Sequence, residues 1–188
     1  KEQSMDGKIG RKLMAIIVES PNGKVVIDPQ VDHEEIANNI EPDWEPKLLM
    51  NRDSPDLVSG RGYGYFKWSD LFTSRQLQAL STFTGLIDNL IEEIKKQAIS
   101  NPNIDGEDNI EINLIAEGIA TYLAFAIDKC TDYWSCFATW MPRGTVGHVF
   151  SKHLIPMTWD YPEANPFSNF HCSWSEAYEW VAKAVELL

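Results

Sequence analysis

The segment Ser74–Ile99, SRQLQALSTFTGLIDNLIEEIKKQAI, decides the fold class of this chain. Its apolar residues recur at steps of three and four, at Leu77, Leu80, Phe83, Ile87, Leu90, Ile91 and Ile94. This spacing places them on one stripe of an α-helix. We therefore predict a helix over the whole segment, with its apolar stripe packed against other helices.

Two more helices are predicted toward the C-terminus, and a polar loop over residues 100–109 precedes the first of them. Residues 111–134 are apolar on two faces, one of isoleucines and one of alanines at every fourth position, which predicts a central, buried helix. Residues 173–188 are amphipathic and begin with Ser173-x-x-Glu176, a capping box. A short helix is also predicted over residues 145–154.

The N-terminal part has a different pattern. The β-branched runs LMAIIV (13–18) and KVVI (24–27) are joined by Ser20-Pro21-Asn22-Gly23, which predicts a β-hairpin. We expect Asp32 to cap a short helix ending near Asn39, and the prolines and glycines of residues 42–64 to prevent regular structure.

The fold class expected from these elements is α+β and mainly helical. An N-terminal β-hairpin is followed by a three- to four-helix bundle with long loops. Residues 1–64 hold the hairpin, short helix and connecting loop, and residues 65–188 form the helical domain. Because the chain starts at Lys1 without an initiator Met and stops inside a predicted helix, we expect one compact unit excised from a longer protein.

Composition narrows the function classes. The 188 residues include 16 Lys and Arg against 28 Asp and Glu, a net charge of −12, which makes the chain alone a poor binder of nucleic acid. Three cysteines without a CxxC motif favour reduced thiols over disulfides. The longest uncharged apolar run, residues 118–127, is too short to cross a bilayer, and no secretory signal is visible, so we expect no membrane contact and a cytoplasmic location.

Several motifs are ambiguous. Gly60-Arg61-Gly62-Tyr63-Gly64 has the spacing of a nucleotide-binding turn but lacks the preceding strand and following helix, which favours a flexible surface loop. Residues 61–68, RGYGYFKW, resemble the aromatic RNP1 strand of RNA-recognition modules, yet such a module needs a four-stranded sheet. We therefore favour aromatics that dock onto the helical core.

The spacing of His148, His153 and His171-Cys172 fits no standard zinc pattern, so no metal site is expected.

The most distinctive segment is the loop of residues 154–168, LIPMTWDYPEANPFS. Two carboxylates, an amide and three aromatic rings in one loop suit either a base-stacking pocket or a well-packed Ω-loop. Asn165-Pro166-Phe167 is similar to the Asn-Pro-Pro-Tyr or Asp-Pro-Pro-Tyr site of amino-methyltransferases, where a polar side chain holds the target amine. Only one proline is present, which favours a packing role.

Three blocks together resemble one family. Residues 68–77 (WSDLFTSRQL), 122–128 (YLAFAID) and 155–168 look like the middle region of large adenine-specific DNA methyltransferases that contain a Zn-ribbon, in the same order. The resemblance covers about residues 62–188. It implies S-adenosylmethionine-dependent methylation of the adenine amino group in DNA by the full-length protein, with S-adenosylmethionine as the cofactor of that protein.

The same resemblance implies that this chain lacks the catalytic parts. In the family, the cofactor-binding Gly-rich turn and the Zn-ribbon lie upstream of this region and the Asp-Pro-Pro-Tyr motif lies downstream, and none of these motifs occurs here. We therefore expect no catalytic, cofactor-binding or metal-binding residue in this chain. The expected partners are the flanking methyltransferase core and, through the full-length enzyme, DNA.

The hypothesis is thus an inserted helical domain that supports the DNA side of such an enzyme and is inactive alone. Trp159, Asp160, Asn165 and Phe167 are expected to shape the target-base pocket, and Arg61 and Arg75 to contact the DNA backbone. The alternative is a structural or protein-interaction module without DNA contact, which the negative charge favours. An RNA-recognition-like module is the third possibility.

Overall fold

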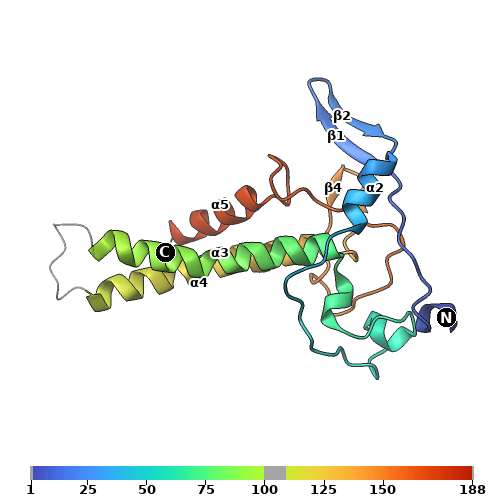
Figure 1. Cartoon of the computed structure of the whole chain (residues 1–188), viewed down its shortest axis with the longest axis horizontal. Helices are drawn as coiled ribbons and strands as arrows, with labels where there is room; N and C mark the ends of the chain where they lie inside the picture. Colours follow the sequence, from blue (N-terminus) through green and yellow to red (C-terminus); the bar gives the residue numbers. More distant parts are fainter. Residues whose placement is uncertain (1, 100–108, 188) are drawn as a thin grey trace.

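A computed structural model describes residues 2–99 and 109–187 (Figure 1). Within these ranges the helices are α1 (Glu2–Met5), α2 (Val31–Asn38), α3 (Ser74–Ile99), α4 (Asn109–Tyr133) and α5 (Trp174–Val185). Two 3₁₀ turns, η1 (Val58–Arg61) and η2 (Trp68–Leu71), precede α3. The strands form two antiparallel pairs, β1 (Ile16–Ser20) with β2 (Gly23–Ile27) and β3 (Trp140–Met141) with β4 (Thr145–Val146). The predicted α+β, mainly helical class is confirmed.

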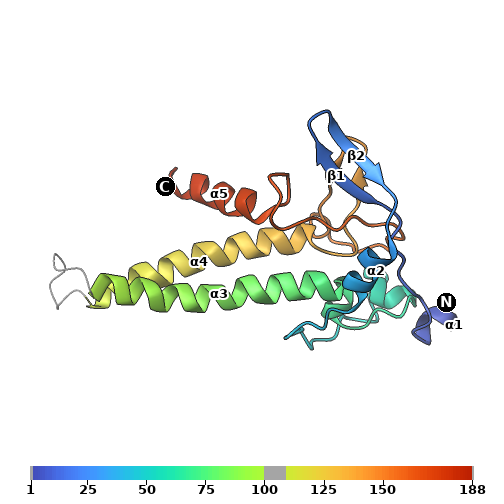
Figure 2. The ribbon, with the colours of Figure 1, turned by 45° about the horizontal axis from the view of Figure 1, so that its top comes forward.

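The long helices α3 and α4 form a hairpin that projects away from the rest of the molecule. They lie side by side and run in opposite directions in both views (Figures 1 and 2), and α5 packs against α4. The helix predicted over residues 74–99 is confirmed to the residue, and the other two long helices begin and end within two or three residues of their predicted bounds. The loop predicted over residues 100–109 lies almost entirely outside the described residues.

The starts of α5 and α2 show which capping signals operate. Ser173 caps α5, since its Oγ accepts a hydrogen bond from Glu176 N at 3.2 Å, while the Glu176 carboxylate accepts one from Cys172 N at 3.2 Å. The expected cap at Asp32 is wrong. The N-cap of α2 is Gln30, whose backbone N–H donates to His33 Nδ1 at 3.1 Å, so Asp32 lies inside the first turn.

The short helix predicted over residues 145–154 is also wrong. Thr145 and Val146 form β4, which pairs with β3, and the chain then turns without regular structure. The Asp132 carboxylate at the end of α4 accepts hydrogen bonds from the backbone N–H of Val149 at 2.8 Å and of Phe150 at 2.7 Å. These bonds remove the donors that a helix would need and hold the segment against α4.

The predicted hairpin is present, with Ile16 opposite Ile27 and Ser20 opposite Gly23, but its first strand is Ile16–Ser20 and not residues 13–18. Gly23 adopts φ 108°, a left-handed conformation that glycine allows at the tight turn. The hairpin stands at the opposite end of the molecule from the tip of α3 and α4 (Figure 1). Lys24 fixes its turn, because the ammonium donates to Gly144 O at 2.7 Å and lies 3.4 Å from the centre of the Phe170 ring.

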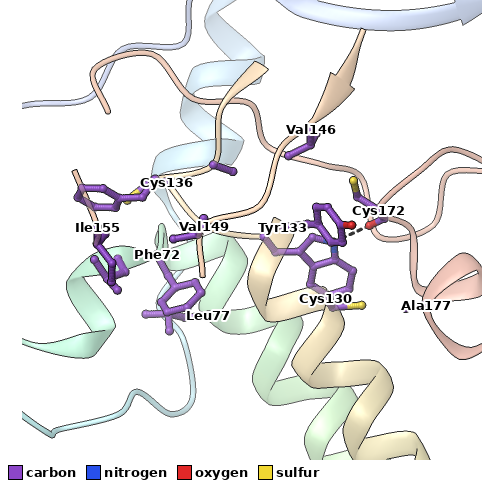
Figure 3. Packing of buried hydrophobic residues seen from close by; sticks show 14 of the residues in the cluster. Phe72, Leu77, Cys130, Tyr133, Cys136, Val146, Val149, Ile155, Cys172 and Ala177 are labelled. Atoms are coloured by element: carbon purple, nitrogen blue, oxygen red, sulfur yellow. Dashed lines mark hydrogen bonds between the residues drawn. The ribbon is translucent and has the colours of Figure 1, made fainter. Parts of the chain in front are cut away.

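The hydrophobic core lies at the base of the helical hairpin, where α3, α4, η1, η2 and the C-terminal loops meet (Figure 3). Trp134, only 1% exposed, donates its indole N–H to Cys172 O at 2.7 Å, and Ser135 Oγ donates to Leu71 O at 2.6 Å. All three cysteines are buried and unpaired, as the sequence predicted. Side chains of the core therefore satisfy the backbone of the loops that they hold.

Only one side of α4 is buried, which corrects the prediction of a central helix. Ile112, Ala116, Ala126 and Cys130 are buried, but apolar side chains on the adjoining flank, among them Ile115 and Ile119, are exposed. We call this flank the α4 outer face, and its members are Leu114, Ile115, Gly118, Ile119, Tyr122 and Phe125. Helix residues Ile110–Tyr133 also include an 18-residue stretch with a mean hydropathy of 1.5, so the helix is long and apolar enough to cross a membrane, a test that core helices of soluble proteins pass too.

Candidate functional site

Five of the six predicted site residues line one large, open cavity of about 2480 Å³. Its walls are the N-terminal arm, β1, the segment from Tyr63 to Leu77 and the C-terminal loop of residues 157–171. Arg75, Trp159, Asp160, Asn165 and Phe167 all lie on it. Arg61 does not, because it lines a separate cavity of about 430 Å³ beside α1. The structure thus brings the predicted base-pocket residues together. Arg61, which we expected to contact the DNA backbone, lies elsewhere.

The loop that carries four of these residues is held by backbone contacts at both ends. Ile155, 4% exposed, donates its N–H to Asp56 O at 2.9 Å and forms a parallel bridge with Leu57. At the other end, Asn165 Oδ1 accepts a hydrogen bond from Phe167 N at 3.0 Å, and Asn165 O accepts one from Ser168 N at 3.2 Å. Asn165 therefore closes an Asx turn, which is a structural role.

Two aromatic rings of this loop are exposed on the cavity. Trp159 is 66% exposed and meets Tyr63 edge to face, with ring centres 5.8 Å apart. Phe167 is 83% exposed, and its ring centre lies 5.9 Å from that of Phe83. Tyr65, by contrast, packs against Phe137 with ring centres 5.0 Å apart. Exposed rings on a fixed loop offer flat apolar surfaces to a ligand.

Arg75 is engaged within the protein. Its Nε donates to Glu163 Oε2 at 2.8 Å and its Nη2 to Glu163 Oε1 at 2.7 Å, a bidentate pair, while Nη1 donates to Ala37 O. The two side chains are 31% and 25% exposed. The guanidinium thus ties α3 to the end of α2 and to the C-terminal loop, and a DNA phosphate would have to displace Glu163 to reach it.

Acidic side chains outnumber basic ones around the cavity. The acidic residues on its walls are Glu19, Asp28, Glu34, Glu45, Asp70, Asp160 and Glu163, and the basic ones are Arg11, Lys12, Lys24 and Arg75. Asp70 is engaged in the local fold, since its Oδ2 accepts from Phe66 N at 2.6 Å and Lys67 N at 2.8 Å. The walls therefore favour a neutral or cationic group over a polyanion.

The glycine motif of residues 60–64 serves the chain's own packing. A Cβ on Gly60 would lie 2.0 Å from Ser54 O, and one on Gly64, at φ 84°, would lie 2.2 Å from Ser4 O. The glycines thus let two backbone segments approach each other, which is their use in tight turns. The segment is a surface loop, as we expected, and its first two residues belong to the 3₁₀ turn η1.

The RNP1-like interpretation lacks the sheet on which it depends. Over the described ranges the two sheets have two strands each, whereas an RNA-recognition module stacks bases on four. Of the aromatic residues following Gly64, Tyr65 and Trp68 pack on the core, as we expected.

The buried titratable groups are not poised for nucleophilic chemistry. Burial raises the pKa of the Cys130 and Cys172 thiols to about 12 and that of Cys136 to about 11, so all three stay protonated at neutral pH. A hydrogen-bonded chain that the sequence did not reveal runs from Asp132 through His148 to Tyr133, with His148 Nε2 3.1 Å from Tyr133 Oη.

The hydrogen-bonded chain from Asp132 to Tyr133 also has a structural role. Burial raises the pKa of Tyr133 to about 12, the opposite of what an activated phenolate needs. The Asp132 carboxylate also binds two backbone N–H groups of the following turn. In the part of the chain that the structure describes, no three His, Cys, Asp or Glu side chains are grouped to hold a metal ion.

No family model, curated protein or solved structure matches this chain.

Proposed function

We propose that the chain is a helical domain inserted in an S-adenosylmethionine-dependent adenine-specific DNA methyltransferase, where it supports the target-base side of the enzyme and is inactive alone. One observation carries the proposal. The loop that bears the family resemblance places two exposed aromatic rings, Trp159 and Phe167, on the same cavity as Asp160 and Asn165.

This arrangement suits an unstacked base. A methyltransferase must extrude its target nucleotide from the duplex, and stacking on a protein ring replaces part of the lost base stacking, worth about 1–3 kcal/mol per base. Trp159 and Phe167 offer such rings. The exposed Asp160 carboxylate can accept a hydrogen bond from an exocyclic amino group, whereas Asn165 holds the loop in shape.

The chemistry itself is assigned to the flanking parts of the longer protein. S-adenosylmethionine, held there, supplies the methyl group. The protonated thiols and the phenol of Tyr133 support a non-catalytic role for this chain. Its net charge of −12 and the acidic walls of the cavity mean that affinity for the DNA backbone must come from the flanking parts too.

The experiment is methyl transfer to duplex DNA by the full-length protein carrying Trp159→Ala or Phe167→Ala. Loss of one stacking ring lowers kcat/KM by roughly 5- to 100-fold. Trp44→Ala is the matched control, because Trp44 is 63% exposed and does not line the cavity. Unchanged methylation in both loop variants, or equal losses in the control, would refute the role of the loop.

A second candidate is a structural or protein-interaction module without DNA contact. The α4 outer face favours it, because Leu114 is 63% exposed and Ile115 and Phe125 are each 53% exposed on one helix. Methylation that is insensitive to Trp159→Ala and Phe167→Ala but lost with charges on the α4 outer face would favour this second function.

A further inference from the structure

The α4 outer face is an apolar surface larger than a soluble monomer normally exposes. Its five side chains are between 38% and 63% exposed, Ile110 next to them is 75% exposed, and Trp180, which contacts Lys129 at the base of α4, is 60% exposed. Residues of this size expose on the order of 180–250 Å² when fully free, so together these seven contribute roughly 600–800 Å². Figure 2 shows that α5 runs beside α4 over only part of its length.

We propose that this face is the interface of a homodimer, in which the α4 helices of two copies pack antiparallel about a two-fold axis. Two such faces bury roughly 1,200–1,600 Å² in total, which is the size of a standard stable protein interface. A two-fold axis uses the same patch on both copies and closes the assembly at two chains. The α4 outer face is a different surface from the cavity, and dimer formation through it does not depend on the proposed function.

The charges at the ends of the face select the antiparallel arrangement. Glu111 lies one turn before Leu114, and Lys129 lies one turn after Phe125. Antiparallel packing places Glu111 of each copy beside Lys129 of the other, whereas parallel packing would bring like charges together. Lys129 already lies 4.5 Å from the Trp180 ring centre, so its ammonium is held at that end of the face.

Gly118 fits the same register. A glycine in the middle of a helix costs about 1 kcal/mol relative to alanine, and the chain's own packing does not require it, because a Cβ there would meet nothing within 4 Å. With Glu111 opposite Lys129, Gly118 of one copy faces Tyr122 of the other. The missing side chain leaves room for that ring and lets the two helices approach closely.

The first test is sedimentation equilibrium of the 188-residue chain between 1 and 100 µM in 300 mM NaCl, a salt concentration that screens the charge on each copy. We expect a mass of twice 21.4 kDa at the upper end of this range. Phe125→Glu, which puts a charge in the interface, raises the dissociation constant at least 30-fold. Ala124→Glu is the matched control, because residue 124 is exposed on the other side of the helix, and it changes the constant less than threefold.

A single species of one-chain mass at 100 µM would overturn the proposal, and so would equal effects of Phe125→Glu and Ala124→Glu. Binding of a monomeric chain to phosphatidylcholine vesicles, lost in Phe125→Glu, would overturn it in favour of a lipid surface. Circular dichroism and urea unfolding verify that Phe125→Glu still folds, as expected for a side chain 53% exposed.

A second test fixes the register. A chain carrying both Glu111→Cys and Lys129→Cys forms a covalent dimer under mild oxidation, because the two positions meet across the axis. Each single variant forms no covalent dimer. In the antiparallel register its cysteine and the same cysteine of the other copy are separated by 18 residues of helix, about 27 Å. Equal cross-linking of the single variants would contradict the antiparallel register.

Discussion

Removing the Arg75–Glu163 ion pair should destabilise the fold, because it joins three segments that are far apart in sequence. The pair is bidentate at 2.7 and 2.8 Å, its side chains are 31% and 25% exposed, and Arg75 also donates to Ala37 O. Fully exposed pairs contribute about 0–1 kcal/mol and charge-assisted bonds at half-buried sites about 1.5–3 kcal/mol. We expect a coupling free energy of about 1–2 kcal/mol between Arg75 and Glu163.

The assay is a double-mutant cycle in urea with Arg75→Ala, Glu163→Ala and the double variant. With an m-value on the order of 2 kcal/mol/M, Arg75→Ala lowers the unfolding midpoint by about 0.5–1 M. The control is the pair of Lys67 and Glu45, 3.6 Å apart and 47% and 41% exposed, for which we expect a coupling below about 0.5 kcal/mol. Equal couplings in the two cycles, or an Arg75→Ala variant with unchanged midpoint, would refute the structural role of Arg75.

Three further predictions concern packing and burial. Gly64→Ala destabilises the chain by about 2–3 kcal/mol in urea unfolding, because its Cβ would lie 2.2 Å from Ser4 O at φ 84°. The control Gly85→Ala, whose Cβ would meet nothing within 4 Å, stabilises α3 by about 0.5–1 kcal/mol. The opposite order of stabilities would show that the loop is not packed as described. The free energy of unfolding falls as pH rises from about 9 to about 12, because the unfolded thiols ionise near 9 while Cys130 and Cys172 keep their protons to about 12; a flat pH profile would contradict their burial. Asp132→Ala leaves the backbone N–H groups of Val149 and Phe150 without their acceptor and lowers the free energy of unfolding in urea by about 2–3 kcal/mol. The control is Asp128→Ala, at an exposed position on the same helix. Equal losses of stability in the two variants would argue against the turn's dependence on Asp132.

The elements predicted correctly were those whose signals are local. The stripe from Leu77 to Ile94 marked α3, the Asn22-Gly23 turn marked the hairpin, and Ser173 with Glu176 marked the start of α5. The error over residues 145–154 came from a distant partner. Residues 145–154 are not helical because Asp132, more than a dozen positions earlier, binds the backbone of Val149 and Phe150. No local pattern carries that information.

The candidate site was predictable in part for the same reason. A single loop carries Trp159, Asp160, Asn165 and Phe167, so its composition alone identified them as a group. The partner of Arg75 was not predictable, because Glu163 lies 88 positions away in sequence. The two apolar faces of α4 were visible too, but periodicity says only that a face is apolar and not which neighbour covers it.

The most direct test of the central claim is the rate of adenine methylation by the full-length protein with Trp159→Ala, compared with Trp44→Ala. We predict that Trp159→Ala lowers kcat/KM by roughly 5- to 100-fold while Trp44→Ala leaves it within about twofold of the unmodified protein. Equal rates in all three proteins would contradict a role for the loop of residues 154–168 at the target base.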